Sequence, residues 1–279
     1  YLYQGDRAFS IAKLTVLSVQ HHYRHLRRNL QEAWDRVETW QLEQPLSMRA
    51  PLPEKVLWGI FAVSLLFGFV WDRSNARDWI GFAVSAVTLF WGLLRPGELY
   101  RLSKRLVNVA PAVGQHISAR VLLAVERAKN QKTMGKSQIA IVTHIVVVRW
   151  ISWYVDILSP REFFLKGGSR KFRKLMGIVL QKLGLPTDLF TPASFRAGGA
   201  TALFVHGTEV ARLRLIGRWK SIPSLDHYIQ EAASTLVTLH LPDHSKKLID
   251  QIVEASSYLR HPPRAPARAV LGRLSSLSA

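Results

Sequence analysis

Residues 191–230 read TPASFRAGGATALFVHGTEVARLRLIGRWKSIPSLDHYIQ, and this stretch decides how the chain is interpreted. Its first part predicts a helix over 192–206, ended by Gly207, because glycine tolerates the left-handed backbone that closes many helices. The small residues at 197–200 allow that helix to pack closely on a neighbour. A second helix is expected to follow and to end before Gly217.

The same stretch sets three side chains at fixed separations. Arg196 precedes Trp219 by 23 positions (219 − 196), and Trp219 precedes Tyr228 by nine (228 − 219). A second arginine, Arg95, lies far upstream in LLRPGEL. Two arginines can hold the non-bridging oxygens of a phosphodiester while a tyrosine oxygen attacks the phosphorus, since guanidinium stays charged and donates paired hydrogen bonds. These residue types are therefore compatible with covalent phosphoryl-transfer chemistry.

The composition points to a polyanionic partner. The 279 residues carry 38 Lys and Arg against 19 Asp and Glu, a formal net charge of +19. Such a charge favours nucleic acid or an anionic membrane surface and does not separate the two. With no cysteine, a disulfide framework and a thiolate zinc site are excluded. No metal ligand set and no glycine-rich nucleotide loop is recognised, so we expect neither metal nor nucleotide cofactor.

Two apolar segments, 56–71 and 79–94, each run 16 residues without a charge. A membrane span usually needs about 20 residues, and four charged residues lie between the segments. We therefore predict two buried core helices over 53–71 and 76–94. A membrane-associated basic protein with a helical hairpin at 56–94 is kept as an alternative.

The remaining chain gives a coarse secondary-structure prediction. Residues 1–46 are polar and helical, and three prolines mark a linker at 44–55. The other expected elements are a helix over 99–109, a β-hairpin within 117–143, a helix from Arg170 to Gly184, and a basic, disordered tail from 255.

Two basic runs predict phosphate contacts. Between residues 99 and 140 there are eight Lys or Arg and one acid, an imbalance typical of a DNA-binding surface, although a solvated hairpin would also be basic. A second run opens the helix after residue 169. The DNA-binding candidates are Arg127, Lys129, Lys136, Arg170, Lys171, Arg173 and Lys174.

These motifs resemble those of the tyrosine recombinases, the phage-integrase-like DNA strand-transfer enzymes, over about residues 48–240. RPGEL resembles the family's first arginine box and SFRAGGAT its second, while GRWKS and LDHYIQ resemble the boxes of its His or Trp and of its nucleophile. These motifs are similar to those of the recombinases of eukaryotic mobile elements, the DIRS-like retrotransposons and cryptons.

The resemblance implies a role for each residue. Arg95 and Arg196 would hold the scissile phosphate, Trp219 would bond or pack against it, and Tyr228 would form a 3′-phosphotyrosyl intermediate. Lys132 would be the general acid that protonates the leaving oxygen, with Lys129 and Lys136 as rivals.

One position departs from the family's pattern. The family usually has histidine or lysine three residues before the second arginine, and here that residue is Ala193, which cannot bond a phosphate or move a proton. His227, next to Tyr228, is a weaker candidate for taking the tyrosine proton. A catalytically decayed relative that only binds DNA is therefore a second hypothesis.

The fold implied is mainly α with a small antiparallel β-hairpin sheet. We expect residues 1–46 to be either the helical remnant of an N-terminal DNA-clamping domain or a linker, 47–240 the catalytic domain, and 241–279 a C-terminal helix and a basic, disordered tail. The resemblance also implies double-stranded DNA as partner, a homotetramer on DNA, and an intracellular location, nuclear if the source is a eukaryote.

Overall fold

The structure is a computed structural model that describes residues 9–43, 50–112, 118–126 and 138–276, together with Ala128 and Gly135. The chain divides into two compact units, Tyr1–Met48 and Arg49–Ala279. The first unit is a helical hairpin of α1 (Phe9–His22) and α2 (Gln31–Glu43), joined by a 3-10 turn at Arg24–Arg28. Its small core contains Ala12, Val37 and Trp40.

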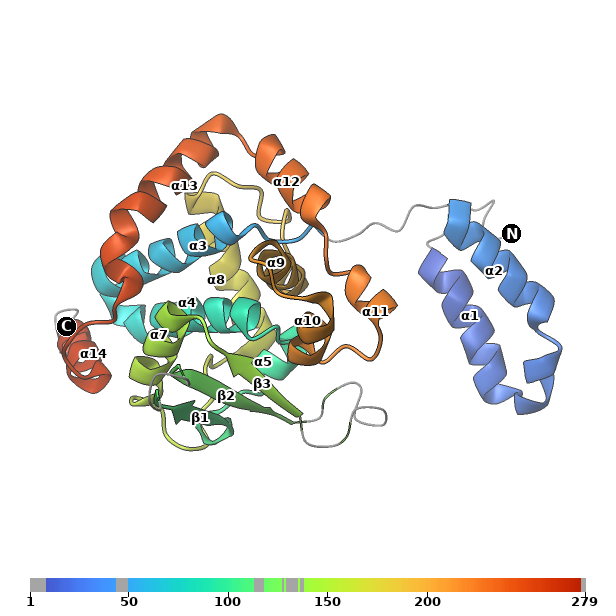
Figure 1. The fold of residues 1–279 in the computed structure, drawn as a ribbon, viewed down its shortest axis with the longest axis horizontal. Helices are drawn as coiled ribbons and strands as arrows, with labels where there is room; N and C mark the ends of the chain where they lie inside the picture. The colour runs from blue at the N-terminus through green and yellow to red at the C-terminus, as the bar shows by residue number, and fades with distance from the viewer. Residues whose placement is uncertain are drawn as a thin grey trace. The chain divides into compact units, whose positions relative to one another are not determined.

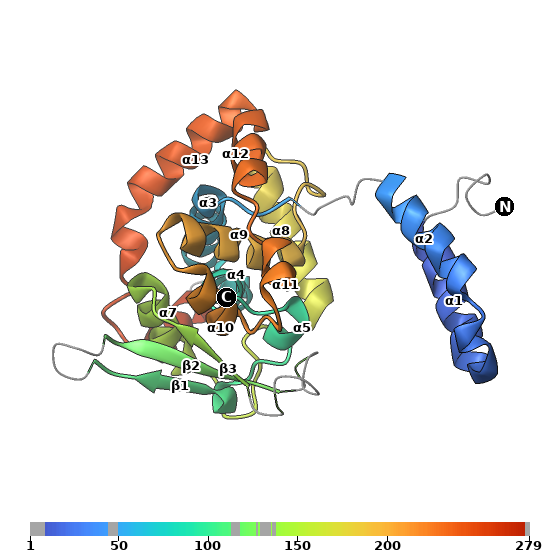
Figure 2. The same cartoon turned by 45° about the vertical axis from the view of Figure 1, so that its right-hand side comes forward.

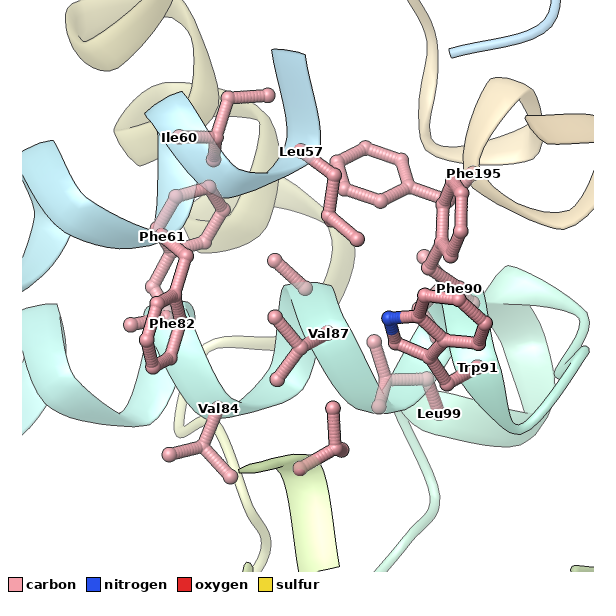
Figure 3. Close-up of a cluster of buried hydrophobic side chains, with 14 of the residues drawn as sticks. Leu57, Ile60, Phe61, Phe82, Val84, Val87, Phe90, Trp91, Leu99 and Phe195 are labelled. Carbon is pink, nitrogen blue, oxygen red and sulfur yellow. The ribbon is translucent and has the colours of Figure 1, made fainter. Parts of the chain in front are cut away.

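Two apolar helices form the core of the second unit. They are α3 (Glu54–Leu66), which continues as a π-helical turn at Phe67–Trp71, and α4 (Ala76–Trp91). Both are apolar on nearly every side, as expected of helices enclosed by other elements. Their side chains interlock with each other and with Phe195 (Figure 3). The prediction of two buried core helices is confirmed.

One stretch in the described part of the chain, Glu54–Trp71, is long and apolar enough to cross a membrane by length and composition alone. In the structure 56% of it is buried inside the protein, where it packs against α4. The core helix of a soluble protein meets the same criterion.

A three-stranded antiparallel sheet lies on the opposite side of α4 from α3 and α13 (Figures 1 and 2). The strands are β1 (Val107–Ala110), β2 (Arg120–Val125) and β3 (Gln138–Val142), in the order β1-β2-β3. Buried and exposed residues alternate along β2 and β3, so one face packs on the helices. The mainly α fold with a small antiparallel sheet is confirmed, and β2 and β3 form the predicted hairpin.

The helix predicted over 99–109 is wrong. The chain instead forms a single helical turn, α5 (Pro96–Leu99), then a 3-10 turn at Lys104–Leu106, and then β1. Backbone hydrogen bonds fix the segment between them, since Leu102 O accepts from Phe164 N and Lys104 N donates to Glu162 O. Pairing with these neighbours outweighs the helical spacing of the leucines.

Three further helices surround the core: α7 (Ile145–Val155), α8 (Gly168–Lys182) and α9 (Pro192–Val205). α9 begins at the N-cap Thr191, whose backbone N–H donates to Ser194 Oγ at 3.1 Å, while the Ser194 N–H donates to the backbone carbonyl of Thr191 at 2.8 Å. A Cβ on Gly198 or Gly199 would overlap the carbonyls of Leu52 or Phe90. The paired glycines therefore bring α9 against the end of α4, as the small residues predict.

The C-terminal part contains α10 (Val210–Gly217), α11 (Ile222–Asp226), α12 (Glu231–His240), α13 (Asp243–Ala255), a 3-10 turn at Ser256–Arg260, and α14 (Ala267–Ser276). The tail after 255 is thus not the disordered segment that its composition predicts. The indoles of Trp150 and Trp153 on α7 donate to the carbonyls of Leu259 and Ala265, and Ala267 is buried. These contacts order the tail despite its basic, proline-rich sequence.

Candidate functional site

Arg196 lies at the centre of a polar cluster in the second unit. It belongs to the second turn of α9, and only 2% of its surface is exposed. Its Nη1 donates to Leu93 O, just after α4, and its Nη2 donates to Gly217 O at the end of α10, at 2.6 Å. The guanidinium thus joins three segments that are far apart in the sequence.

Trp219 and Tyr228 lie beside this guanidinium. The Arg196 Cζ is 4.4 Å from the centroid of the Trp219 ring and 5.5 Å from that of Tyr228, and the two rings are 5.0 Å apart. Trp219 is buried, while Tyr228 is half-buried. Gly217 has no room for a side chain, since a Cβ there would overlap the Trp219 ring. The structure therefore brings together the three residues that the spacing singles out.

The backbone of Tyr228 is fixed by Thr201 on α9. The Thr201 Oγ1 donates to Tyr228 O and accepts from Gln230 N, each at 3.1 Å. Helices α10 and α11 and the short α5 lie next to one another in both views (Figures 1 and 2). α9 and the loop after α11 together hold the tyrosine near Arg196.

Arg95 joins the cluster through Glu98. Arg95 is the N-cap of α5, and the buried Glu98 accepts its backbone N–H and its Nη1, both at 2.9 Å. The other major partner of Glu98 is Arg218, whose Nη2 donates to Oε2 at 2.6 Å. Arg218 also donates to Leu93 O at 3.4 Å, the same carbonyl that Arg196 uses. One carboxylate and one carbonyl therefore connect three arginines.

Burial and mutual repulsion set the electrostatics of the cluster. Burial, with Arg218 and Arg95 close by, lowers the pKa of Arg196 to about 9. Burial alone would raise the pKa of Glu98, but Arg218, the Arg95 backbone N–H, Arg196 and the Arg95 guanidinium hold it below its ordinary value. Three guanidiniums and one carboxylate leave two net positive charges (3 − 1). The cluster is therefore electrostatically suited to an anion.

The side chains that pack against Tyr228 include buried donors without an acceptor. Among the described residues, Arg196 Nε and Trp219 Nε1 are buried and have no hydrogen-bond partner. A buried N–H without a partner costs about 1–3 kcal/mol, and such groups often occur where a ligand binds. Both belong to residues in contact with each other and with Tyr228.

The basic residues predicted on α8 form an exposed ridge. Arg170, Arg173 and Lys174 are exposed at i, i+3 and i+4, whereas Lys171 is half-buried and pairs with Asp78 at 2.5 Å. Tyr100, directly after α5, contacts Phe172 on this helix at 5.9 Å. The ridge therefore begins near the Arg95 segment, and Lys171 contributes a link to α4.

The hairpin candidates Arg127, Lys129, Lys132 and Lys136 lie outside the described residues. The general-acid role of Lys132 and its rivals stays a prediction. Ala193 lies in the first turn of α9. His206 bonds Glu54 at 2.8 Å, and His227 is exposed. Within the described segments no group of three or more His, Asp or Glu could hold a metal ion.

Two residues of the cluster have no signal in the motif spacing. Glu98 is visible in RPGEL, but the roles of Arg218 and of the Leu93 carbonyl depend on backbone conformation. Leu93 has φ 47° and Arg218 has φ 60°, a left-handed backbone conformation that residues other than glycine rarely adopt. In the sequence motifs, Arg218 is visible only as the arginine of GRWKS, and nothing there indicates its role.

Glu98→Gln is expected to lower the free energy of unfolding by about 3–5 kcal/mol near neutral pH, because it leaves buried guanidiniums without their carboxylate. The folded-state pKa of Glu98 lies below its unfolded value, so its contribution is complete above the unfolded pKa and is lost as pH falls through the folded pKa. Urea denaturation should show the difference from wild type shrinking in acid. A difference that stays constant with pH would contradict this, and Glu254→Gln, exposed on α13, is the control.

No protein-family profile and no curated protein matches the chain. Solved structures with a similar fold include a crystal structure of XerA recombinase, at 16% identity and a TM-score of 0.45, covering 80% of this chain and 66% of that one. The structure of XerH site-specific recombinase bound to difH substrate has 16% sequence identity and a TM-score of 0.45, and the match covers 67% of this chain and 53% of that one. The Tn1549 transposon integrase in complex with transposon right end DNA has 15% sequence identity and a TM-score of 0.46, and the match covers 84% of this chain and 85% of that one. The chain thus spans less than two thirds of the length of the two Xer recombinases.

Proposed function

We propose that this protein is a DNA strand-transferase of the tyrosine recombinase type. The Tyr228 oxygen attacks a DNA phosphorus, the bond from phosphorus to the 5′ oxygen breaks, and the 5′ strand leaves as a free hydroxyl. The 3′-phosphotyrosyl link conserves the bond energy, so a second 5′-hydroxyl can reverse the step and join a new strand.

The observation that carries this proposal is the assembly of Arg95, Arg196, Trp219 and Tyr228 from separate segments into one cluster with two net positive charges. The transition state of phosphoryl transfer gathers negative charge on the non-bridging oxygens, and preorganised donors stabilise it. The buried N–H groups of Arg196 and Trp219 that lack an acceptor would supply such donors once a phosphate reaches them.

Contact with a phosphate requires a local rearrangement. Arg196 is buried and its Nη atoms bond the carbonyls of Leu93 and Gly217. Phosphate oxygens would replace these acceptors, since a charged oxygen accepts a stronger hydrogen bond than a carbonyl does. The observed arrangement then corresponds to the state without DNA.

The surface charge supports DNA as the substrate. The net charge of +19 and the exposed α8 ridge suit non-specific phosphate contacts, which supply affinity and positioning rather than sequence choice. We also propose that Lys132 donates the proton to the leaving oxygen, that full exchange uses a homotetramer on double-stranded DNA, and that the protein acts inside the cell, in the nucleus if its source is a eukaryote.

The test uses nicked suicide duplexes, in which the short strand released by cleavage diffuses away and traps the covalent intermediate. Purified full-length protein is incubated with a random-sequence library of such duplexes and resolved on a denaturing gel. The expected result is a protein–DNA adduct whose DNA is attached to the peptide containing Tyr228, identified by mass spectrometry. Attachment at another residue would overturn the assignment of the nucleophile.

A catalytically decayed DNA-binding protein is the second candidate, and Ala193 favours it because this position lacks a group that can bond phosphate or move a proton. This candidate predicts salt-dependent binding of the library without any adduct. The substitution Ala193→His, which puts an imidazole in the first turn of α9, would then be expected to restore adduct formation if only this group is missing.

A further inference from the structure

Leu93 and Arg218 are the two residues other than glycine with positive φ in the described part of the chain, at 47° and 60°. This conformation costs a residue with a side chain about 1–2 kcal/mol and persists where the surroundings over-determine it. Both residues belong to the arginine cluster, and Leu93 O accepts hydrogen bonds from Arg196 and Arg218. The backbone strain is therefore concentrated at the candidate site.

The left-handed backbone at Arg218 has a specific geometric result. It closes α10 as the C-cap and turns the chain between Gly217, whose carbonyl Arg196 bonds, and Trp219, whose ring Arg196 covers. It also directs the Arg218 side chain inward, where 4% is exposed and Nη2 reaches Glu98 Oε2. Glycine would adopt the same backbone without strain, so the arginine side chain itself has a role.

We propose that Arg218 is a positioning residue that, through Glu98 and the Leu93 carbonyl, sets the orientation and the net charge of the Arg95–Arg196 pair. This rests on the proposed function. Arg218 Nη2 donates to Glu98 Oε2, Arg95 Nη1 donates to Oε1, and 24% of the Arg95 side chain is exposed.

The charge count indicates which step should depend on Arg218. With Arg218 the cluster has two net positive charges (3 − 1), and without it one (2 − 1). A DNA phosphodiester is a monoanion, whereas the transition state of attack concentrates additional charge on the same oxygens. The second positive charge therefore stabilises the transition state more than the bound substrate, which affects the rate and not the affinity.

The experiment compares Arg218→Gly, Arg218→Lys and a control, Arg268→Gln, in the full chain. Arg218→Gly relieves the strained backbone and removes the charge, while Arg218→Lys keeps both the strain and the charge. Arg268 is exposed on α14, where it bonds Asp156 O, and it is outside the cluster. Each variant is measured for melting temperature, affinity for the library-selected suicide duplex, and single-turnover rate of adduct formation.

The expected result is an adduct rate about 10- to 100-fold lower for Arg218→Gly, with DNA affinity within about threefold of wild type. Arg218→Lys should recover part of the rate, and Arg268→Gln should match wild type. A merely structural role predicts the reverse order, with Arg218→Gly at full rate because its backbone is relaxed. That outcome, or equal losses in rate and affinity, would overturn the positioning role.

A second readout does not need the covalent reaction. The protein is labelled with 5-fluorotryptophan, and the resonance of Trp219 is assigned with Trp219→Phe and followed by ¹⁹F NMR during titration with inorganic phosphate. We expect a saturable shift in wild type and about tenfold weaker binding in Arg218→Gly, because dianionic phosphate approaches the transition-state charge. Equal binding would overturn the inference. If wild type forms no adduct but this difference is found, the strand-transfer proposal fails and the positioning role of Arg218 stands.

Discussion

Replacing Tyr228 with phenylalanine is expected to abolish the covalent protein–DNA adduct and to leave DNA affinity unchanged. The substitution removes only the attacking oxygen, because the Tyr228 ring packs 5.0 Å from Trp219 and the backbone is held by Thr201. Loss of a nucleophile typically costs more than about 10⁴-fold in rate, so the adduct should fall below detection on a denaturing gel.

The matched control is Tyr258→Phe, because Tyr258 is 65% exposed in the turn before α14 and should form no part of the reaction. Its adduct yield and melting temperature should equal those of wild type. An adduct that persists in Tyr228→Phe would refute Tyr228 as the nucleophile. Loss of DNA binding in the same variant would show that the hydroxyl serves the complex and not the chemistry.

The local signals of α9 and α10 are strong enough for prediction from sequence. A proline at N1, a threonine cap and Gly207 fix the ends of α9, and the structure ends the helix there with Gly207 at φ 82°. The apolar runs of α3 and α4 predict buried helices because no amphipathic stripe is left for solvent. These features belong to the chain itself and need no knowledge of its neighbours.

The sequence-based predictions fail where contacts with distant segments of the chain determine the local structure. Residues 107–110 are a strand because Val109 pairs with Val121 of β2, a partner that helical spacing cannot reveal. The C-terminal tail has the composition of a disordered segment, but Trp150 and Trp153 bond its carbonyls and α14 packs beside α4. In both cases tertiary hydrogen bonds override the local preference.

Some features of the candidate site could likewise be predicted from the sequence, and others could not. The resemblance of the sequence motifs predicts that Arg196, Trp219 and Tyr228 share one site, and their side chains do lie in contact. It cannot predict that Arg196 bonds two backbone carbonyls, nor that Arg218 turns inward in a left-handed conformation. Such features depend on how α4, α9 and α10 meet, which the spacing of residues within one segment does not encode.

Replacing Arg196 with methionine is expected to separate activity from stability. Methionine retains much of the volume but removes the guanidinium that would hold the phosphate, so the rate of adduct formation should fall by about 10²- to 10³-fold. Stability near neutral pH should not fall, because the buried charge lies close to Arg95 and Arg218 and replacing buried ionic groups by apolar ones is often neutral or favourable.

The pH dependence of the free energy of unfolding provides a second test of the Arg196→Met prediction. Burial, with the neighbouring arginines, lowers the pKa of Arg196 to about 9, below its value in the unfolded chain. Between the two values the unfolded state binds one more proton than the folded state, so the free energy of unfolding of wild type rises with pH relative to Arg196→Met. Urea denaturation at neutral pH and at increasing pH above about 9 measures the difference.

Arg268→Met, which removes an exposed guanidinium on α14, controls for the loss of charge alone and should show no such trend. A marked loss of stability in Arg196→Met at neutral pH would contradict the prediction, because the bonds to Leu93 O and Gly217 O would then stabilise the fold and explain the burial of Arg196 without a phosphate. A stable but inactive variant instead indicates that the buried charge is kept at a cost to the fold, as expected when it serves the chemistry.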